Sequence, residues 1–176
     1  TVTVDGVIGG SNALATLDIN ASSGSGAIEV NDIGAGNSDG VTGLTRLGSS
    51  GISLTFDGST YNYGGGITVG GNYTGSGFTT SGDVQISGNF TTSGASTINS
   101  GGNNVTITGN LAGGAATDTV TITDGGGNAT GTITIGGTIS GVRSVSLTGG
   151  GAVSLGGNIT TTDLSVVDPD LEVPMC

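Results

Sequence analysis

Histidine, lysine and tryptophan are all missing from this chain of 176 residues, which has a single cysteine. Without histidine, neither a Ser-His-Asp nor a Cys-His catalytic arrangement can form, and a His-ligated zinc site is excluded as well. The cysteine is Cys176, and without a second cysteine the chain cannot form a disulfide framework. We expect Cys176 to be incidental rather than an intermolecular link.

Charged residues are also scarce, at 9% of the chain, and nearly all of them are acidic. Arg46 and Arg143 stand against 13 acidic residues, which gives a formal net charge of −11. Such a surface cannot neutralise phosphate groups, so we expect binding neither to nucleic acid nor to anionic membranes. No apolar run reaches about 18 residues, so a helical membrane span is not expected. The acidic composition, rich in Thr, Asn and Gly, favours an extracellular or cell-surface location.

The chain opens on the strand-like run Thr-Val-Thr-Val at 1–4, with neither a basic region nor an apolar leader before it. A secretion signal is therefore expected to have been removed or to lie outside this sequence.

Proline is rare and glycine abundant, with 2 and 39 residues respectively. The lack of a strict Gly-X-Y period excludes collagen. Gly/Ser-rich chains usually form flexible linkers, but here aliphatic residues recur at alternate positions, which is typical of strands. No window places apolar residues at i, i+3, i+4 and i+7, and strings of Gly and Thr oppose a helix. We therefore expect an all-β protein.

A seven-residue phrase recurs through the second half of the chain. Each copy has an aliphatic, a polar and a second aliphatic residue, then Gly-Asn or an equivalent pair, then another apolar residue. Successive copies begin 17, 21, 28 and 20 residues apart. A variable step near 20 residues is typical of a solenoid whose units tolerate loops. The copies are Ile-Thr-Val-Gly-Gly-Asn-Tyr at 67–73, Val-Gln-Ile-Ser-Gly-Asn-Phe at 84–90, Val-Thr-Ile-Thr-Gly-Asn-Leu at 105–111, Ile-Thr-Ile-Gly-Gly-Thr-Ile at 133–139 and Val-Ser-Leu-Gly-Gly-Asn-Ile at 153–159.

Strands this short are unstable alone, but coiling them into a parallel β-helix, or β-solenoid, lets each pair with its equivalents in the turns above and below. At about 20 residues per turn, the sequence predicts about 8–9 turns in a single domain over 1–167. Residues 1–66 are expected to be less regular than 67–167, and 168–176 are predicted to be an extended acidic tail. Asp57-Gly58, between two strand-like runs, predicts a hairpin. An antiparallel β-sandwich is the alternative fold.

The Gly-Asn pair of the phrase is predicted to form the bend between stacked strands. Glycine can supply a positive φ there, and asparagine can pair its side-chain amide with the asparagine of the next turn. We expect no catalytic, cofactor-binding or metal-binding residues. The residues with this turn or ladder role are Asn72, Asn89, Asn110 and Asn158, together with Gly71, Gly88, Gly109 and Gly157.

Two stretches resemble secreted bacterial exoproteins of the filamentous-haemagglutinin or autotransporter type. They are Gly-Asn-Asn-Val-Thr-Ile-Thr-Gly-Asn-Leu at 102–111 and Ser-Val-Ser-Leu-Thr-Gly-Gly-Gly-Ala-Val-Ser-Leu-Gly-Gly-Asn-Ile at 144–159. The resemblance covers most of 67–167. It implies a right-handed parallel β-helix that acts as an adhesin or surface filament. The N-terminal secretion module of that family is not evident, which leaves open an interior piece of a larger exoprotein or a small complete subunit.

Three other interpretations use particular residues. A polysaccharide lyase would need a base and clustered acids that hold calcium, for which Arg143 with Asp118 and Asp124 is the candidate group, and a glycoside hydrolase would need two facing carboxylates, which a chance pair among the thirteen acids could supply. The tail residues Asp168, Asp170 and Glu172 could form a calcium site, although a solvated acidic segment is the simpler interpretation. An ice-binding surface is the third, because Thr-x-Thr pairs would project outward from stacked strands; these pairs are Thr106-x-Thr108, Thr121-x-Thr123 and Thr132-x-Thr134. Threonine is also a favoured residue on the solvent face of any strand.

We therefore predict a non-catalytic, extracellular β-solenoid with a structural or adhesive role. Open strand edges at both ends of a solenoid favour pairing with another chain. The expected partners are a second copy in an end-to-end fibre, or the rest of a larger exoprotein, and a host or matrix glycan or protein.

Overall fold

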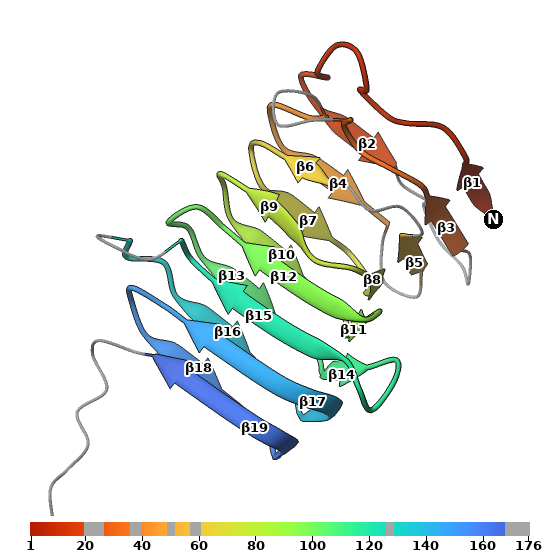
Figure 1. Cartoon of the computed structure of the whole chain (residues 1–176). Helices are drawn as coiled ribbons and strands as arrows, with labels where there is room; N and C mark the ends of the chain where they lie inside the picture. Colours follow the sequence, from red (N-terminus) through yellow and green to blue (C-terminus); the bar gives the residue numbers. More distant parts are fainter. Residues whose placement is uncertain (20–26, 36–39, 49–51, 57–60, 126–128, 168–176) are drawn as a thin grey trace, which may run out of the picture.

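The structure of the chain is a computed structural model that describes residues 1–19, 27–35, 40–48, 52–56, 61–125 and 129–167. These residues form nineteen β-strands and no helix, so no helix in this portion of the chain could cross a membrane. Every pair of named strands is parallel, and the strands stack turn upon turn along one axis (Figure 1). The protein is therefore a parallel β-solenoid, and the antiparallel sandwich is excluded.

One side of the solenoid is a seven-stranded sheet that we call the narrow wall. Each of its strands has three residues, with the outer two facing inward and the middle one facing outward. Five of its strands are the aliphatic–polar–aliphatic starts of the repeated phrase, which confirms that prediction. The strands of the narrow wall are β2 (Leu17–Ile19), β4 (Thr45–Leu47), β7 (Ile67–Val69), β10 (Val84–Ile86), β13 (Val105–Ile107), β16 (Ile133–Ile135) and β18 (Val153–Leu155).

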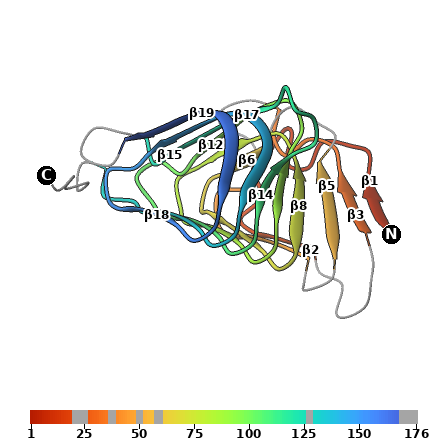
Figure 2. The ribbon, with the colours of Figure 1, turned by 90° about the horizontal axis from the view of Figure 1, so that it is seen from below.

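The remaining strands form a twelve-stranded sheet with two columns. Figure 2 shows this sheet and the narrow wall around the interior. The first column contains β1 (Val2–Val4), β3 (Ala27–Val30), β5 (Ser53–Phe56), β8 (Asn72–Gly75), β11 (Phe90–Thr92) and β14 (Leu111–Gly113). The second, which we call the broad wall, contains β6 (Asn62–Tyr63), β9 (Phe78–Thr80), β12 (Ala95–Asn99) and β15 (Thr119–Thr123). The two columns merge in β17 (Ile139–Thr148) and β19 (Ile159–Val167), which run along both.

The turns differ in length. From β4 onward, the strands of the narrow wall begin 22, 17, 21, 28 and 20 residues apart, which makes about 5 turns of about 21 residues. The predicted repeat length agrees with this value, but the predicted 8–9 turns are too many. Dividing the whole length by 20 overestimates the count, because the five steps from 45 to 153 use only 108 of the 176 residues.

The core is a set of aliphatic columns with one aromatic cluster. The inward residues of β10, Val84 and Ile86, and those of β13, Val105 and Ile107, are at most 1% exposed. Rings from successive turns stack, with centroids 4.4 Å apart for Phe56 and Tyr73 and 5.4 Å for Tyr73 and Phe90. All six aromatic residues of the chain lie in this cluster: Phe56, Tyr61, Tyr63, Tyr73, Phe78 and Phe90. Burying each of these large apolar side chains contributes about 1.5–3 kcal/mol, so the columns are a main source of the stability of the solenoid.

The predicted hairpin at Asp57-Gly58 lies outside the described residues. The strands on either side of it, β5 and β6, pair in parallel with strands of neighbouring turns. They therefore take part in the solenoid rather than in an antiparallel hairpin. The division of the chain at residue 66, the acidic tail and the right-handed coil stay predictions.

Candidate functional site

A ladder of asparagines lies at the corner between the narrow wall and the first column. Each side-chain oxygen accepts the backbone N–H of the equivalent residue one turn further on. The Oδ1 of Asn72 accepts the N–H of Asn89 at 2.8 Å, and the Oδ1 of Asn89 accepts the N–H of Asn110 at 2.8 Å. Asn110 in turn accepts the N–H and the hydroxyl of Thr138 at 2.8 and 3.1 Å. In the observed ladder, each side-chain oxygen thus accepts a backbone N–H, whereas the sequence predicts hydrogen bonds between the side-chain amides of successive asparagines.

Asn158 lies at the end of the same corner and is exposed. Its backbone carbonyl accepts the N–H of Ile139 at 2.9 Å. Thr138 occupies the asparagine position in the turn before, so a threonine lies between Asn110 and Asn158 in this stack.

Three glycines of this corner, Gly88, Gly109 and Gly157, are needed for close approach between turns rather than for an unusual backbone angle. Gly71, Gly88, Gly109 and Gly157 are not among the glycines with positive φ, which corrects the sequence prediction. A Cβ on Gly88 would lie 2.6 Å from the carbonyl oxygen of Gly71, and one on Gly109 would lie 2.6 Å from that of Gly88. A Cβ on Gly157 would lie 2.6 Å from the carbonyl oxygen of Gly137. Any side chain here would push neighbouring turns apart.

A second ladder, which sequence reasoning missed, lies at the other end of the narrow-wall strands. The backbone N–H and the side-chain amide of Asn104 donate to the Oδ1 of Asp83 at 3.0 and 3.2 Å. The backbone N–H and the hydroxyl of Thr132 donate to the Oδ1 of Asn104, both at 3.0 Å. The available signal was the polar residue directly before the phrase, at 83, 104 and 132. Side-chain ladders thus hold both ends of these strands.

The residues considered for a lyase are not assembled into one site. The backbone N–H of Arg143 donates to the backbone carbonyl of Asp118 at 2.8 Å, while the Asp118 carboxylate accepts the N–H of Ala115 at 2.9 Å. Asp124 is fully buried, and its carboxylate accepts the N–H of Gly150 at 2.6 Å. Asp118 and Asp124 flank the five residues of β15, so they lie roughly 20 Å apart along the strand. Oxygen ligands lie about 2.3–2.6 Å from a calcium ion, so these two aspartates are too far apart to hold the same ion.

Within the described ranges, no group of three or more His, Cys, Asp or Glu side chains is placed to hold a metal ion. The tail residues Asp168, Asp170 and Glu172, considered above for calcium, lie outside those ranges.

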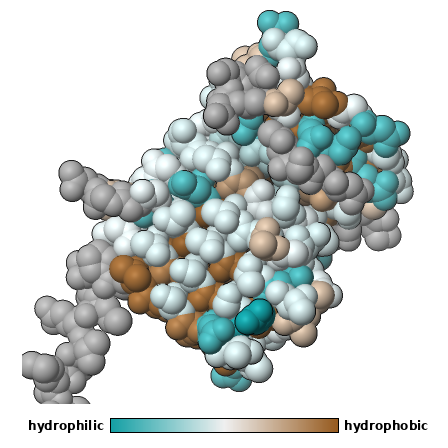
Figure 3. Space-filling view, in the orientation of Figure 1, coloured by the Kyte–Doolittle hydropathy of each residue, from teal (hydrophilic) through white to brown (hydrophobic). Residues whose placement is uncertain are grey.

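The outer face of the broad wall carries hydroxyl groups in register. Thr119, Thr121 and Thr123 alternate with the buried Val120 and Ile122 along β15, so the threonines face outward. Strand pairing extends these positions into three files across the wall. The files are Ala95–Thr119–Ser144–Asp163, Thr97–Thr121–Ser146–Ser165 and Thr79–Asn99–Thr123–Thr148–Val167. In Figure 3, rows of residues of near-neutral hydropathy cover this face.

Of the three Thr-x-Thr pairs considered in the sequence, only Thr121-x-Thr123 lies on the broad wall. Thr106 and Thr134 are the middle residues of β13 and β16 on the narrow wall. Because a narrow-wall strand has three residues, it presents one outward side chain per turn within the strand. The narrow wall therefore carries a single file where the broad wall carries three.

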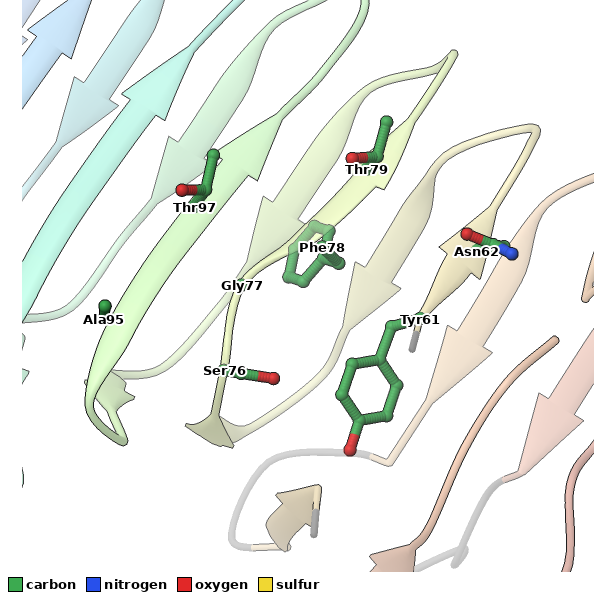
Figure 4. A pocket seen from close by; sticks show the side chains of 8 residues that line it. All are labelled: Tyr61, Asn62, Ser76, Gly77, Phe78, Thr79, Ala95 and Thr97. Carbon is green, nitrogen blue, oxygen red and sulfur yellow. The ribbon is translucent and has the colours of Figure 1, made fainter. Parts of the chain in front are cut away.

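A shallow depression interrupts the broad wall at β9. It has a volume of about 330 Å³ and an apolar floor formed by Tyr61 and Phe78, each 3% exposed. Thr79 and Thr97, on neighbouring strands, are at its rim (Figure 4). The remaining residues around the depression are Asn62, Ser76, Gly77 and Ala95. Hydroxyl groups fill all three files only on β15 and β17, because β12 presents Ala95, Thr97 and Asn99, and β19 presents Asp163, Ser165 and Val167.

Apolar side chains are exposed at the two ends of the solenoid. Leu164 is 44% exposed although its partner one turn inward, Val145, is 1% exposed. Val2 is 47% exposed and its partner Ile28 is 1% exposed. Apolar surface is visible over β19 in Figure 3. All six exposed large hydrophobic residues of the described ranges lie in the first or last turns: Val2, Val7, Leu14, Ile159, Leu164 and Val167.

Together, the stacked walls, the corner ladders and the apolar ends define the class of this protein as a parallel β-solenoid with polar sides. Comparison with models of protein families, with curated proteins and with solved structures finds no match to the chain.

Proposed function

We propose that the chain is a non-catalytic, extracellular β-solenoid with a structural or adhesive role, either within a larger surface adhesin or as the subunit of a cell-surface fibre. This is the role implied by its resemblance to filamentous-haemagglutinin-type exoproteins. The observation that carries the proposal is the position of the exposed apolar residues. Four of them pair with buried residues of the neighbouring turn and so occupy inward-facing positions of the end turns, where another turn would bury them: Val2, Leu14, Ile159 and Leu164.

The strand columns support the addition of further turns at both ends. The narrow wall begins with β2 and ends with β18, and the first column begins with β1 and ends with the first half of β19. The column of the broad wall extends beyond β6 through single bridges that join Tyr63 to Val41 and Val41 to Leu14. Because all the columns are parallel, turns added at either end can continue each column in the same direction. Such head-to-tail addition gives an open filament when the subunits are separate chains.

The side walls support a scaffold or spacer. Most of their outward residues are short and polar, with Arg46 and Gln85 as long exceptions on the narrow wall. Repeated parallel pairing makes stability a sum of contacts between neighbouring turns. The surface between the ends carries no exposed large hydrophobic residue among those described. Glycans or proteins of a host or matrix are the proposed targets of an adhesive face.

The test is electron microscopy with light scattering at increasing protein concentration, in enough salt to screen the acidic surface. Wild-type protein is expected to form unbranched filaments or rods whose length grows with concentration. Leu164→Asp places a charge on the C-terminal end and is expected to stop this growth. Thr97→Asp adds the same charge to the exposed broad wall and is the matched control.

Particles of constant size for the wild type, together with no binding to glycan or matrix arrays, would contradict the proposal. Equal effects of the two substitutions would contradict the assignment of the ends as the contact surfaces. Circular dichroism of both variants checks that the β-structure is retained.

A further inference from the structure

The broad wall contains a regular patch of hydroxyl groups that the structural role does not require. We define the hydroxyl array as Thr119, Thr121 and Thr123 of β15 with Ser144, Ser146 and Thr148 of β17. The two strands pair in register over all three positions, so the residues form three facing pairs. The register shift in β17 lies earlier in the strand, between Ile139 and Val142. The array itself is therefore free of a bulge.

The array repeats in two directions. Neighbouring strands of a sheet are about 4.8 Å apart, and outward residues along a parallel strand are about 6.6 Å apart, two residues at about 3.3 Å each. The neighbouring strand β12 adds Thr97 and Asn99 in the same files, and β19 adds Ser165. The wall therefore offers a two-dimensional lattice of hydroxyl groups, with threonine methyl groups between them.

Most hydroxyls of the array have no hydrogen-bond partner among the described residues. Only Thr123 makes a side-chain hydrogen bond there, as its hydroxyl accepts the N–H of Gly125 at 3.0 Å. Threonines at the corners differ, because the hydroxyls of Thr132 and Thr138 donate to the asparagine ladders. Holding the turns together thus uses the corner hydroxyls and leaves those of the array available to solvent or a ligand.

The array is also uncharged, although the chain has a net charge of −11. The acids that flank β15 do not project over it: Asp118 is 6% exposed, Asp124 is fully buried, and both carboxylates accept backbone N–H groups. The nearest exposed acid in the files is Asp163, at the edge of β19. The six residues of the array thus offer a charged ligand no complementary group, and the exposed charges that border the array are Arg143 and Asp163, beside Ser144.

We propose that the hydroxyl array binds the surface of an ice crystal. A rigid lattice of hydroxyl and methyl groups holds water molecules at regularly spaced positions. The surface of ice is itself a regular two-dimensional lattice of water molecules, and each of them can form hydrogen bonds with such a surface. Polysaccharide is the weaker fit, because a sugar ring stacks on exposed aromatic faces and all six aromatic side chains of this chain are buried. Ice binding by this wall is independent of the structural or adhesive role.

The experiment measures inhibition of ice recrystallisation and thermal hysteresis with wild type, Thr121→Tyr and Thr106→Tyr. Thr121 is the central residue of β15, which pairs with β12 on one side and β17 on the other. A tyrosine ring at this position would project from the array and keep a flat surface from approaching it. Thr106 is the centre of β13 on the narrow wall, equally paired on both sides and also partly buried. Tyrosine is favoured in strands, so both variants are expected to fold.

Wild type and Thr106→Tyr are expected to inhibit recrystallisation, and Thr121→Tyr is expected to lose most of that activity while keeping the same circular dichroism spectrum. No inhibition by folded wild type would overturn the proposal, as would equal loss in both variants. Binding of the wild type to crystalline cellulose or chitin without any effect on ice would overturn it as well. Self-association is measured separately by light scattering. A negative result in the ice assays therefore does not contradict the proposed structural role.

Discussion

Replacing Gly109 with alanine tests whether the corner glycines are required by the contact between turns. The new Cβ would lie 2.6 Å from the carbonyl oxygen of Gly88 and 2.4 Å from the Oδ1 of Asn89. Both atoms also accept hydrogen bonds at this corner. Gly109 N–H donates to Gly88 at 3.0 Å, and Asn110 N–H donates to Asn89 at 2.8 Å. The two turns must separate to admit the methyl group, and both hydrogen bonds then lengthen.

The expected loss of stability has two components. Overpacking costs about 1–3 kcal/mol, and weakening two hydrogen bonds costs about 0.5–1.5 kcal/mol each. The free energy of unfolding is therefore expected to fall by about 2–6 kcal/mol. For a chain of this length, each kcal/mol lowers the melting temperature by about 2–4 °C, so a fall of at least about 4 °C is expected.

The assay is thermal and urea unfolding followed by circular dichroism, with Gly6→Ala as the matched control. A Cβ on Gly6 meets nothing within 4 Å, and Gly6 is not among the glycines with positive φ. Gly6→Ala is therefore expected to change stability by less than about 0.5 kcal/mol. If Gly109→Ala melts together with this control, the close approach of the turns is not what requires glycine at position 109.

Two further predictions concern the asparagine ladder and the buried tyrosines. Asn89→Ala removes the acceptor of the Asn110 N–H and is expected to lower the free energy of unfolding by about 0.5–1.5 kcal/mol. Asn89→Asp keeps an acceptor oxygen and is expected to lose less; equal losses in urea unfolding would contradict a hydrogen-bonding role. Burial raises the pKa of the Tyr63 and Tyr73 hydroxyls well above the ordinary value of 10.0. Their contribution to stability is fully present below about pH 10 and is lost above it, because the unfolded chain releases these protons first, at up to about 1.4 kcal/mol per pH unit for each tyrosine. Tyr63→Phe is expected to make the alkaline fall in urea midpoints shallower, and an unchanged slope would count against this origin.

Several features were predictable from the sequence because they depend on near neighbours in the chain. The alternation of apolar and polar residues in copies such as Val84–Ile86 and Val105–Ile107 places the aliphatics on one face of a strand. The Gly-Asn pairs end those strands, and the repeat near 20 residues requires the same unit to be stacked. The all-β class, the solenoid and the strands of the narrow wall follow from these patterns.

Other features depend on how residues of different turns meet, which spacing along the chain does not specify. The aromatic cluster joins Phe56 to Phe90 through Tyr73 because the register between turns places their strands side by side. The ladder from Asp83 through Asn104 to Thr132 likewise depends on that register, since its members are 21 and 28 residues apart.

The sequence by itself determined that this chain is a β-solenoid with aliphatic columns inside and hydroxyl-rich strands outside, because a two-residue period needs only local geometry. Only the tertiary structure shows why glycine is required at the corner, because a Cβ on Gly109 would collide with the backbone of Gly88 in another turn. It also decided which threonines face one another. Thr121 meets Ser146 across two paired strands, while Thr106 stands in a single file on the opposite sheet. Both follow from the stacking of turns, which brings together residues that are distant in sequence.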